Sequence, residues 1–397
     1  MAAGDAHRLR PLSDPARVEV LVAPDSYKGS LTSVAVAQAL ADGWVRGRPT
    51  DTVVLAPLAD GGEGTLDAIA ASGGWTELPA SARDPRMRPI DARFLRRGPE
   101  AIVELAVASG LSCVDAAERD AGAATTLGTG QVLAAAIGLG CGAIVLGLGG
   151  SATTDGGTGL LTALGARFLD AEGRDLPPGG LALADLAAVD LDGLSPVLAE
   201  VELTIASDVS NPLCGPTGAA ATYGPQKGAD PELVARLDAA LARLADLLEA
   251  ATGRSVRDLP GAGAAGGTTA GLLAIADRFR SLSVRPGVDV VMERTGFDAR
   301  LAAAGLVLTG EGRIDAQTAY GKTALGVARR ARATGVPCIA FGGGVTPEGA
   351  AALAAEGAIA LPVAEAPGTL AAAIAAGTAP LARAAERAAR LVTLGGR

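Results

Sequence analysis

Hydrophobic residues near the amino terminus gather in short runs, each followed by a polar, glycine-rich loop and then by helical spacing. Residues 18–23 (VEVLVA) form a β-branched run that is typical of a buried strand. Val, Ala and Leu recur at helical spacing over 32–44, and the pattern repeats as a strand over 52–58 and a helix over 65–71. This alternation predicts a parallel α/β sheet with loops at the carboxyl ends of its strands.

The carboxyl-terminal part of the chain shows the same alternation. It predicts strands over 305–309, 336–341 and 358–362, separated by helices near 322–333 and 347–356 and followed by an Ala-rich helix. The two ends together, residues 18–72 and 291–397, predict one Rossmann-like, doubly wound α/β domain.

The middle of the chain, residues 73–290, has a different sequence pattern. Pro- and Arg-rich turns over 83–97 precede a strand over 101–107, and a helix is predicted over 231–250. We interpret this region as a second α/β domain inserted into the first. Residues 1–17 contain no apolar segment, so we expect a disordered extension and no signal peptide.

Composition excludes several classes of function. Hydrophobic residues make up 49% of the chain and charged residues 19%, which favours a large core. A net charge of −9 and an aromatic content of 3% argue against nucleic-acid and membrane-surface partners. No apolar run reaches the roughly 20 residues that a membrane-spanning helix needs, so a cytoplasmic location is expected.

The small number and the positions of the histidine and cysteine residues restrict which catalytic bases and metal ligands the protein can use. His7 is the only histidine and lies in the polar extension. The four cysteines, Cys113, Cys141, Cys214 and Cys338, are widely spaced and are interpreted as reduced thiols. A general base should therefore be Asp, Glu or Lys, and a bound metal should be a hard cation held by oxygen atoms.

Glycine accounts for 55 of the 397 residues and concentrates in loops that also carry reactive side chains. The first loop, 24–30 (PDSYKGS), places Lys28 and Ser30 before a helix. Lys28 would contact phosphate or a carboxylate, or the loop is a helix cap with a solvated lysine. The second loop, 60–65 (DGGEGT), carries Asp60 and Glu63, which either bind a ligand or form an acidic first helical turn.

Three further loops lie in the middle region. The loop 147–159 (GLGGSATTDGGTG) predicts a phosphate-binding loop and lacks the GxGxxG dinucleotide pattern. The loop 208–227 carries Asp208 and Asn211, which offer oxygens to Mg²⁺, and Lys227, which would neutralise phosphate; a long structural turn is the alternative. The turn 260–267 (PGAGAAGG) either wraps a nucleotide or permits close helix packing.

The sixth loop, 309–322 (TGEGRIDAQTAYGK), is crowded with polar side chains between a predicted strand and helix. Arg313 suits bidentate recognition of a carboxylate or phosphate. The GKT at 321–323 resembles the end of a P-loop, but Ala316 stands where that motif requires glycine. We therefore reject a Walker A site.

These six loops, in this order, resemble those of the type I glycerate kinase family, the bacterial glycerate 2-kinases. The resemblance extends from about Val18 to the last helix. It implies ATP-dependent phosphorylation of D-glycerate with Mg²⁺, giving 2-phosphoglycerate, on a Rossmann-like domain with an inserted second domain.

The motifs and the chemistry of their side chains suggest roles for particular residues. Arg313 and Lys28 are expected to hold the substrate carboxylate or the transferring phosphate, and Asp60 and Asp315 are the leading candidates for the base, ahead of Asp155. The expected substrate-binding residues are Ser30, Glu63, Glu311, Gln317, Thr318 and Lys322. The expected ATP-binding residues are Gly149, Gly150, Ser151, Thr153, Asp155, Gly156, Lys227, Gly263 and Gly266. Asp208 and Asn211 are the expected Mg²⁺ ligands.

Two other interpretations stay open. One is a glycerate 3-kinase or a kinase of another small hydroxy acid. The other is a non-catalytic ligand-sensing protein, which would have no need to keep so many loop carboxylates and lysines. A homodimer is compatible with the sequence but is not indicated by it.

Overall fold

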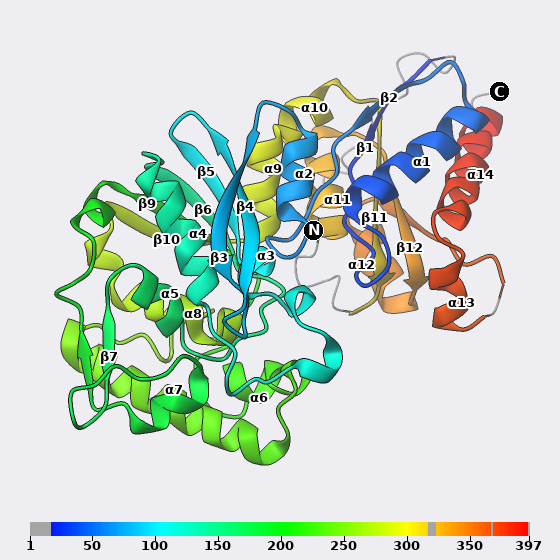
Figure 1. Ribbon diagram of the computed structural model, residues 1–397. Coiled ribbons are helices and arrows are strands. Elements are labelled where there is room, and N and C mark those ends of the chain that lie inside the picture. Colours follow the sequence, from blue (N-terminus) through cyan, green and yellow to red (C-terminus); the bar gives the residue numbers. More distant parts are fainter. Residues whose placement is uncertain (1–16, 317–322, 367, 396–397) are drawn as a thin grey trace, which may run out of the picture. The chain divides into compact units, whose positions relative to one another are not determined.

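The computed structural model describes residues 17–316, 323–366 and 368–395 (Figure 1). The chain divides into two compact units. Unit 1 comprises Met1–Asp60, Asp67–Gly73 and Val288–Arg397, and unit 2 comprises Gly61–Leu66 and Gly74–Gly287. The domain boundaries predicted from the sequence lie between residues 72 and 73 and between residues 290 and 291. In the structure the boundaries lie between residues 73 and 74 and between residues 287 and 288, and the short Gly61–Leu66 segment belongs to unit 2. The predicted extension 1–17 lies, except for Arg17, outside the described residues.

Unit 1 is built on a five-stranded sheet in the order β13-β12-β11-β1-β2, and all of its strand pairs are parallel. The blue strands from the start of the chain lie beside the orange strands from its end (Figure 1). The strands are β1 (Glu19–Val22), β2 (Thr52–Leu55), β11 (Leu306–Ile314), β12 (Cys338–Val345) and β13 (Ala358–Pro362). The helices are α1 (Ser33–Gly47), α2 (Thr65–Ala71), α9 (Gly287–Thr295), α10 (Phe297–Ala303), α11 (Thr323–Thr334), α12 (Pro347–Ala355), α13 (Leu370–Ala375) and α14 (Ala379–Gly395), with the first residues of α2 and α9 belonging to unit 2.

Close helix packing stabilises unit 1. Helix α1 begins where the Thr32 hydroxyl accepts a hydrogen bond from the Ala35 N–H, the usual way to satisfy an exposed helical donor. Its Gly43 lies against α14 so closely that a Cβ would be 1.9 Å from the Ala382 carbonyl oxygen. The absence of a side chain there lets the two helices approach, and Trp44 completes the core between them and the sheet.

Unit 2 contains a six-stranded mixed sheet in the order β10-β9-β6-β5-β4-β3 and a separate β7-β8 pair. Strands β5, β6, β9 and β10 run parallel, whereas β3 and β4 are antiparallel to their neighbours. The strands are β3 (Thr76–Arg83), β4 (Pro89–Arg97), β5 (Glu100–Glu104), β6 (Ala143–Gly147), β7 (Arg167–Leu169), β8 (Ala188–Asp190), β9 (Glu202–Ala206) and β10 (Ser281–Arg285). The helices are α3 (Ala106–Ser109), α4 (Leu127–Gly138), α5 (Thr158–Ala163), α6 (Ala219–Tyr223), α7 (Pro231–Thr252) and α8 (Ala264–Ala274).

These topologies confirm the α/β class and the doubly wound arrangement expected for the two chain ends. Two predicted strand ends are wrong, however. The strand predicted to end at residue 309 continues through GEGR as β11 as far as Ile314, and the strand predicted to end at residue 341 continues through the next glycines as β12 as far as Val345. Glycines have low strand propensity, so the local pattern indicated a loop. Parallel pairing of Gly310 with Phe341 and of Arg313 with Gly344 keeps both strands in the sheet.

Candidate active site

The strand order of unit 1 creates a natural ligand position. The chain proceeds from β1 outward to β2 on one side, while β11, β12 and β13 follow one another on the other side. The direction of winding therefore changes between β1 and β11. In open α/β sheets, ligands bind at the carboxyl ends of the strands at such a switch point.

Asp25 lies at this point, in the loop that follows β1. Its backbone N–H donates to the Gly310 carbonyl, and its side chain is only 5% exposed. One carboxylate oxygen accepts a hydrogen bond from the Ser26 N–H at 2.6 Å, and the other accepts one from the Thr323 hydroxyl at 2.6 Å. Asp25 thereby joins the first loop to the first residue of α11.

Tyr27 holds the same loop against β11 and β12. Its hydroxyl donates to the Phe341 carbonyl oxygen at 2.9 Å, and burial, with the nearby Glu311 carboxylate, raises the pKa of Tyr27. The space that it fills is lined by glycine: a Cβ would lie 3.3 Å from Tyr27 atoms at Gly310 and at Gly312, and 3.5 Å away at Gly343. The glycines in β11 and β12 thus leave room for Tyr27, the residue before Lys28.

Lys28 and Asp60 form an ion pair between the loop after β1 and the loop after β2. The Lys28 Nζ lies 2.6 Å from Asp60 Oδ2, and the Lys28 side chain is 75% exposed. Desolvation lowers the pKa of Lys28, but the charges of Asp60, Asp25 and Glu311 outweigh it and raise the pKa above its ordinary value. Lys28 is therefore a cation at neutral pH, accessible to an anionic ligand.

The remaining predicted site residues of unit 1 that the structure describes are either buried in the sheet or exposed at the surface. Glu311 is buried in β11, whereas Arg313 is exposed and lies 3.2 Å from Asp315. Ser30 is exposed, and its hydroxyl donates to the Tyr27 carbonyl at 2.8 Å, which stabilises the turn. Gln317, Thr318 and Lys322 lie outside the described residues.

In unit 2, residues 61–65 of the DGGEGT loop pack against the glycine loop that follows β6. A Cβ at Gly147 would be 2.6 Å from the Gly61 carbonyl oxygen, and one at Gly149 would be 2.5 Å from the Cα of Gly62. Glu63 is exposed and lies beside Gly150, whose Cβ would be 3.7 Å from that of Glu63. The two predicted loops therefore do come together within this unit.

Glu104, which ends β5, organises the start of α2. Its carboxylate accepts the backbone N–H groups of Gly64 at 3.1 Å and Leu66 at 2.9 Å. A buried carboxylate at a helix start both satisfies free donors and complements the helix dipole. Sequence reasoning did not single out Glu104, because nothing local marks the end of β5 as a partner for residues 38 and 40 positions earlier.

Asp155 lies inside the glycine loop and does not face outward. It is fully buried and accepts hydrogen bonds from Thr125, both the N–H and the hydroxyl of Thr126, Gly157 and Gly159. These donors fix the shape of the loop. Ser151 pairs with Gly110 in an isolated bridge, and the buried Thr153 hydroxyl has no hydrogen-bond partner in the described chain.

Lys227 lies behind the same loop. It is fully buried, and its Nζ donates to the Thr153 carbonyl oxygen at 2.5 Å. Burial lowers the pKa of Lys227 to about 7, although the Asp155 carboxylate opposes this shift. A group buried in this way supports the backbone of the loop; direct contact with a nucleotide stays a prediction.

The PGAGAAGG turn is closely packed at its predicted ligand-binding glycines. A Cβ at Gly263 would be 2.3 Å from the Pro212 carbonyl oxygen, and one at Gly266 would be 2.0 Å from that of Thr153. Gly266 also has a φ of +66°, in the left-handed region that favours glycine. Close packing therefore accounts for these two glycines, and Gly156 donates its N–H to the Gly266 carbonyl.

Asp208 and Asn211 follow β9. Asp208 is exposed, and its Oδ1 accepts the Gly287 N–H at 2.9 Å. The Asn211 amide donates to Thr217 and Thr222, and its Oδ1 accepts the Tyr223 hydroxyl at 2.8 Å. In the parts of the chain that the structure describes, no cluster of three or more His, Cys, Asp or Glu side chains is arranged to hold a metal.

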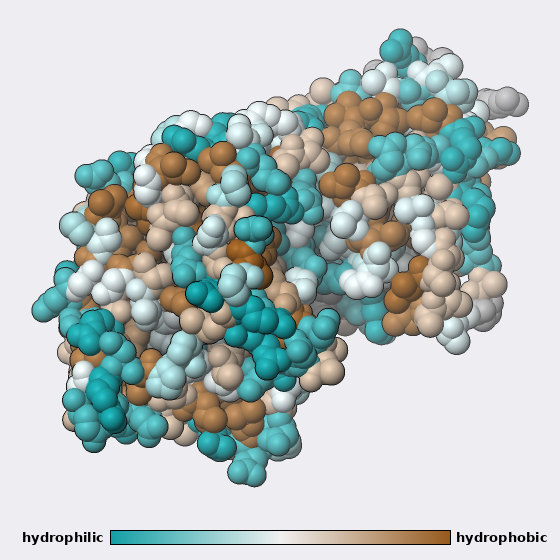
Figure 2. Space-filling view, in the orientation of Figure 1, coloured by the Kyte–Doolittle hydropathy of each residue, from teal (hydrophilic) through white to brown (hydrophobic). Residues whose placement is uncertain are grey.

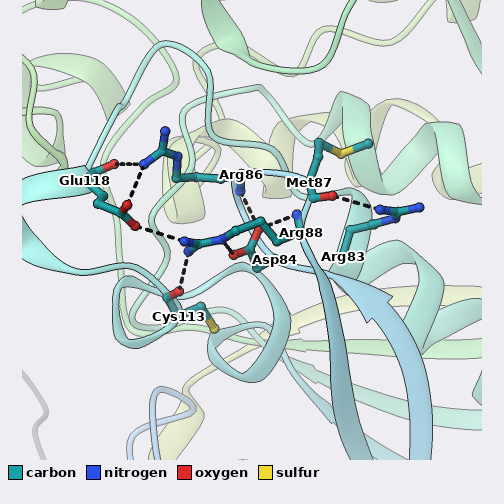
Figure 3. A network of polar contacts seen from close by, with 7 residues as sticks. All are labelled: Arg83, Asp84, Arg86, Met87, Arg88, Cys113 and Glu118. Atoms are coloured by element: carbon teal, nitrogen blue, oxygen red, sulfur yellow. Dashed lines mark hydrogen bonds and ion pairs between the residues drawn. The ribbon is translucent and has the colours of Figure 1, made fainter.

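A polar network supports the loops of unit 2 from the turn between β3 and β4 (Figure 3). Asp84 is buried and forms an ion pair with Arg88. Arg88 also donates to Glu118 at 3.0 Å and to the Cys113 carbonyl at 3.4 Å. Because this arginine is held by protein acceptors, we interpret the network as structural.

A shallow hollow on unit 1 lies over α1 and β2, where Figure 2 shows hydrophobic surface. Its lining includes Val45 and Val53, together with Arg46, which pairs with Glu386. The lining lacks the grouped cations and glycines of a phosphate site, and we assign the hollow no function.

Sequence reasoning missed two residues at the switch point. Asp25 lies just after the first predicted strand, as Asp60 lies after the second, but it was assigned no role. Thr323 was interpreted only as part of a false P-loop. The signal for Asp25 was therefore present, whereas its pairing with Thr323 joins residues 298 positions apart and needs the tertiary structure.

Comparison with known proteins agrees with these features. The family model described as "Glycerate kinase family" matches residues 20–393. The Bacillus subtilis protein named glycerate kinase is 40% identical over 331 residues, covering 83% of this chain and 86% of that protein. The Escherichia coli protein named glycerate 2-kinase is 39% identical over 331 residues, with the same coverage of 83% and 86%.

A solved structure extends the agreement to three dimensions. The crystal structure of a Salmonella typhimurium LT2 protein described as a glycerate kinase 2 has a TM-score of 0.78 at 37% identity, and the match covers 96% of this chain and 99% of that one. Among the described residues, no helix is both long and apolar enough to span a membrane. From its sequence motifs, its fold and these relatives, the chain belongs to the glycerate kinase family.

Proposed function

We propose that the protein transfers the γ-phosphate of ATP to the 2-hydroxyl of D-glycerate, forming 2-phosphoglycerate and ADP. The observation that carries the proposal is the group formed by Asp25, Lys28, Asp60 and Glu311 at the switch point of unit 1, in a chain of this family. Phosphoryl transfer requires positioning, neutralisation of charge and a modest base. This group supplies a cation for an anionic substrate and carboxylates for its hydroxyls.

The roles of the individual residues follow from their surroundings. Lys28 and the exposed Arg313 would bind the glycerate carboxylate or the transferring phosphate. Glu311 would contact the glycerate hydroxyls, and Ser30 would shape the loop that carries Lys28. Glu63, which belongs to unit 2, stays a substrate contact expected from sequence alone. We retain Gln317, Thr318 and Lys322 as further substrate contacts from sequence alone.

ATP would bind to unit 2 through the glycine loop after β6. The exposed Gly150 offers a backbone N–H group to phosphate oxygens. The Gly149 N–H donates to the Gly61 carbonyl at 3.2 Å, and Ser151 and Thr153 are buried, so these three residues stay nucleotide contacts expected from sequence alone. Asp155, Gly156, Lys227, Gly263 and Gly266 would act by holding this loop in shape, since all five are buried.

Mg²⁺ would accompany the nucleotide. This ion is commonly held by one or two carboxylates together with substrate phosphates, so a dedicated protein cage is not required. The exposed Asp208 fits that role. Asn211 fits it only through the second lone pair of Oδ1, because the rest of its amide is used within the loop. When bound, the ion would neutralise phosphate charge.

A coupled assay of ADP release tests the proposal. The full-length protein is given D-glycerate, ATP and Mg²⁺, and the product is then offered to enzymes specific for 2- or 3-phosphoglycerate. We expect ADP release that depends on D-glycerate and Mg²⁺, with product accepted as 2-phosphoglycerate. A 3-phosphoglycerate product would reassign the hydroxyl, and an absence of turnover with D-glycerate would overturn the proposed function. We also propose a cytoplasmic location, because an ATP-dependent kinase needs the nucleotide pool found there.

A further inference from the structure

The geometry points to Asp25 as the catalytic base that accepts the proton of the glycerate hydroxyl during phosphoryl transfer. This inference rests on the proposed function and names the residue that sequence reasoning left open between Asp60 and Asp315. Asp25 occupies the end of β1 at the switch point of unit 1, with its carboxylate fixed by two hydrogen bonds.

The two carboxylates favoured by the sequence are both engaged with cations. Asp60 Oδ2 lies 2.6 Å from Lys28 Nζ, and Asp315 Oδ2 lies 3.2 Å from Arg313 Nε. Each of these carboxylates therefore has an oxygen engaged by a basic side chain. Both residues are therefore better suited to orienting their basic partners toward an anionic substrate.

Asp25 differs in having neutral partners. Its hydrogen bonds come from a backbone N–H and from the Thr323 hydroxyl, and within the described chain no basic side chain lies within ion-pair distance of it. Burial, followed by the charge of Asp60, raises the pKa of Asp25 to about 6; the Thr323 hydrogen bond, the charge of Lys28 and the Ser26 N–H oppose this. A base with a pKa close to the working pH is both ionised and effective.

The charged groups around Asp25 come from three elements. Asp60 approaches from the loop after β2, Lys28 lies in the same loop as Asp25, and Glu311 on β11 acts on Lys28 and Tyr27. Thr323, from the start of α11, is a positioning residue, because its hydroxyl orients one oxygen of the carboxylate.

The proposed step balances in atoms and charge. The glycerate hydroxyl oxygen forms a bond to the γ-phosphorus of ATP, and the bond from that phosphorus to the β–γ bridging oxygen breaks, leaving its electron pair on ADP. The hydroxyl proton passes to an Asp25 carboxylate oxygen and is later released to water, which regenerates the base.

Asp25→Asn tests the inference, because the amide keeps the size of the side chain and an oxygen that can accept from Thr323. We expect kcat with D-glycerate to fall by about 10²- to 10⁴-fold, the usual contribution of a general base, while KM for ATP changes by less than about threefold. The matched variants Asp60→Asn, Asp315→Asn and Glu311→Gln should each lose less kcat than Asp25→Asn. Asp25→Asn that keeps more than about a tenth of wild-type kcat would overturn the inference.

The pH profile of kcat/KM tests the role of Asp25 separately, because a purely structural residue would not set the position of its acidic limb. The wild-type profile should fall on its acidic side with an apparent pKa of about 6. Asp60→Asn removes a charge that raises the pKa of Asp25, so this limb should move to lower pH; Thr323→Val removes a hydrogen bond that lowers it, so the limb should move to higher pH. An acidic limb that stays in place in both variants would contradict the assignment.

The two proposals fail in different ways. A wild-type protein that does not phosphorylate D-glycerate removes the proposed function itself. A wild-type protein that does so, with an active Asp25→Asn variant, removes only the role of Asp25. Folding of each variant is checked by circular dichroism and thermal unfolding, and if Asp25→Asn does not fold, the opposite pH shifts of Asp60→Asn and Thr323→Val decide the question.

Discussion

The Lys28 ammonium lies 2.6 Å from the Asp60 carboxylate, so two loops from neighbouring strands, β1 and β2, are joined at the carboxyl edge of the unit 1 sheet. The pair is partly exposed, and pairs of this kind contribute little to stability. The pair instead orients Lys28: Asp60 holds this accessible cation beside the switch point, where it would bind a substrate carboxylate or a phosphate.

Removal of the Lys28 charge should therefore affect substrate use more than folding. We expect Lys28→Met to lower kcat/KM for D-glycerate by about 10²-fold, comparable with removal of one donor to developing negative charge. Steady-state kinetics measure this. Arg46→Met is the control, since Arg46 is also a partly exposed cation in an ion pair of unit 1, with Glu386. Equal losses in the two variants would argue against a specific role for Lys28.

Asp51 should be a strong contributor to the stability of unit 1. Its buried carboxylate accepts hydrogen bonds from the Val18 N–H, the Trp44 indole and the Arg48 guanidinium. We expect Asp51→Ala to lower the free energy of unfolding by about 3 kcal/mol, because Arg48 would lose its buried partner. Urea denaturation at neutral pH measures this loss, and a change below about 0.5 kcal/mol would contradict it.

The same carboxylate predicts acid sensitivity. Burial alone would raise the pKa of Asp51, but the hydrogen bonds from Arg48, Trp44 and Val18 lower it below its ordinary value. A depressed pKa means that the stabilisation is complete above the unfolded-state value of about 3.9 and is lost as pH falls through the lower folded-state value. The difference in urea midpoint of unfolding between wild type and Asp51→Asn should therefore be constant above about pH 5 and shrink below about pH 4.

Gly266 should be far less tolerant of a side chain than a glycine with a similar backbone in open space. Gly266→Ala combines left-handed strain with a Cβ 2.0 Å from the Thr153 carbonyl oxygen, so we expect a loss of about 3 kcal/mol. Gly253, at the end of α7, has a φ of +70°, and a Cβ added there would have no atom within 4 Å. Gly253→Ala should cost only about 1 kcal/mol. Chemical denaturation of both variants compares them, and similar losses would exclude the close packing.

Lys227 should make unit 2 more stable as the solution becomes alkaline. Its pKa is lowered to about 7, so above that pH the folded protein holds a neutral lysine, while the unfolded chain binds a proton up to about pH 10.4. Stability should rise with pH between these values, by at most about 1.4 kcal/mol per pH unit. Relative to wild type, Lys227→Met should lack this contribution. Identical slopes of melting temperature against pH, over roughly pH 7–9, would show that Lys227 is charged in the folded protein.

Much of this architecture was accessible from local patterns. The apolar runs that became β1 and β2, and the helical spacing that became α1 and α7, depend on side chains close in sequence. The loops with Lys28, Asp60 and Asp208 were singled out as candidate sites because glycine next to charged residues after a strand is unusual, whatever the rest of the fold does. The order of those loops was sufficient to indicate the family.

The tertiary structure decided what those residues do with one another. Gly310 and Gly343 look like loop residues locally, yet they belong to strands because pairing between β11 and β12, which are distant in sequence, keeps them in the sheet. Asp155 and Lys227 look like ligand-binding residues in sequence but are turned inward, where buried donors and acceptors must find partners. Burial and the charge of Asp60 raise the pKa of Asp25, and the Thr323 hydroxyl orients its carboxylate. Because desolvation and charge act through space, no local sequence pattern could have specified this environment.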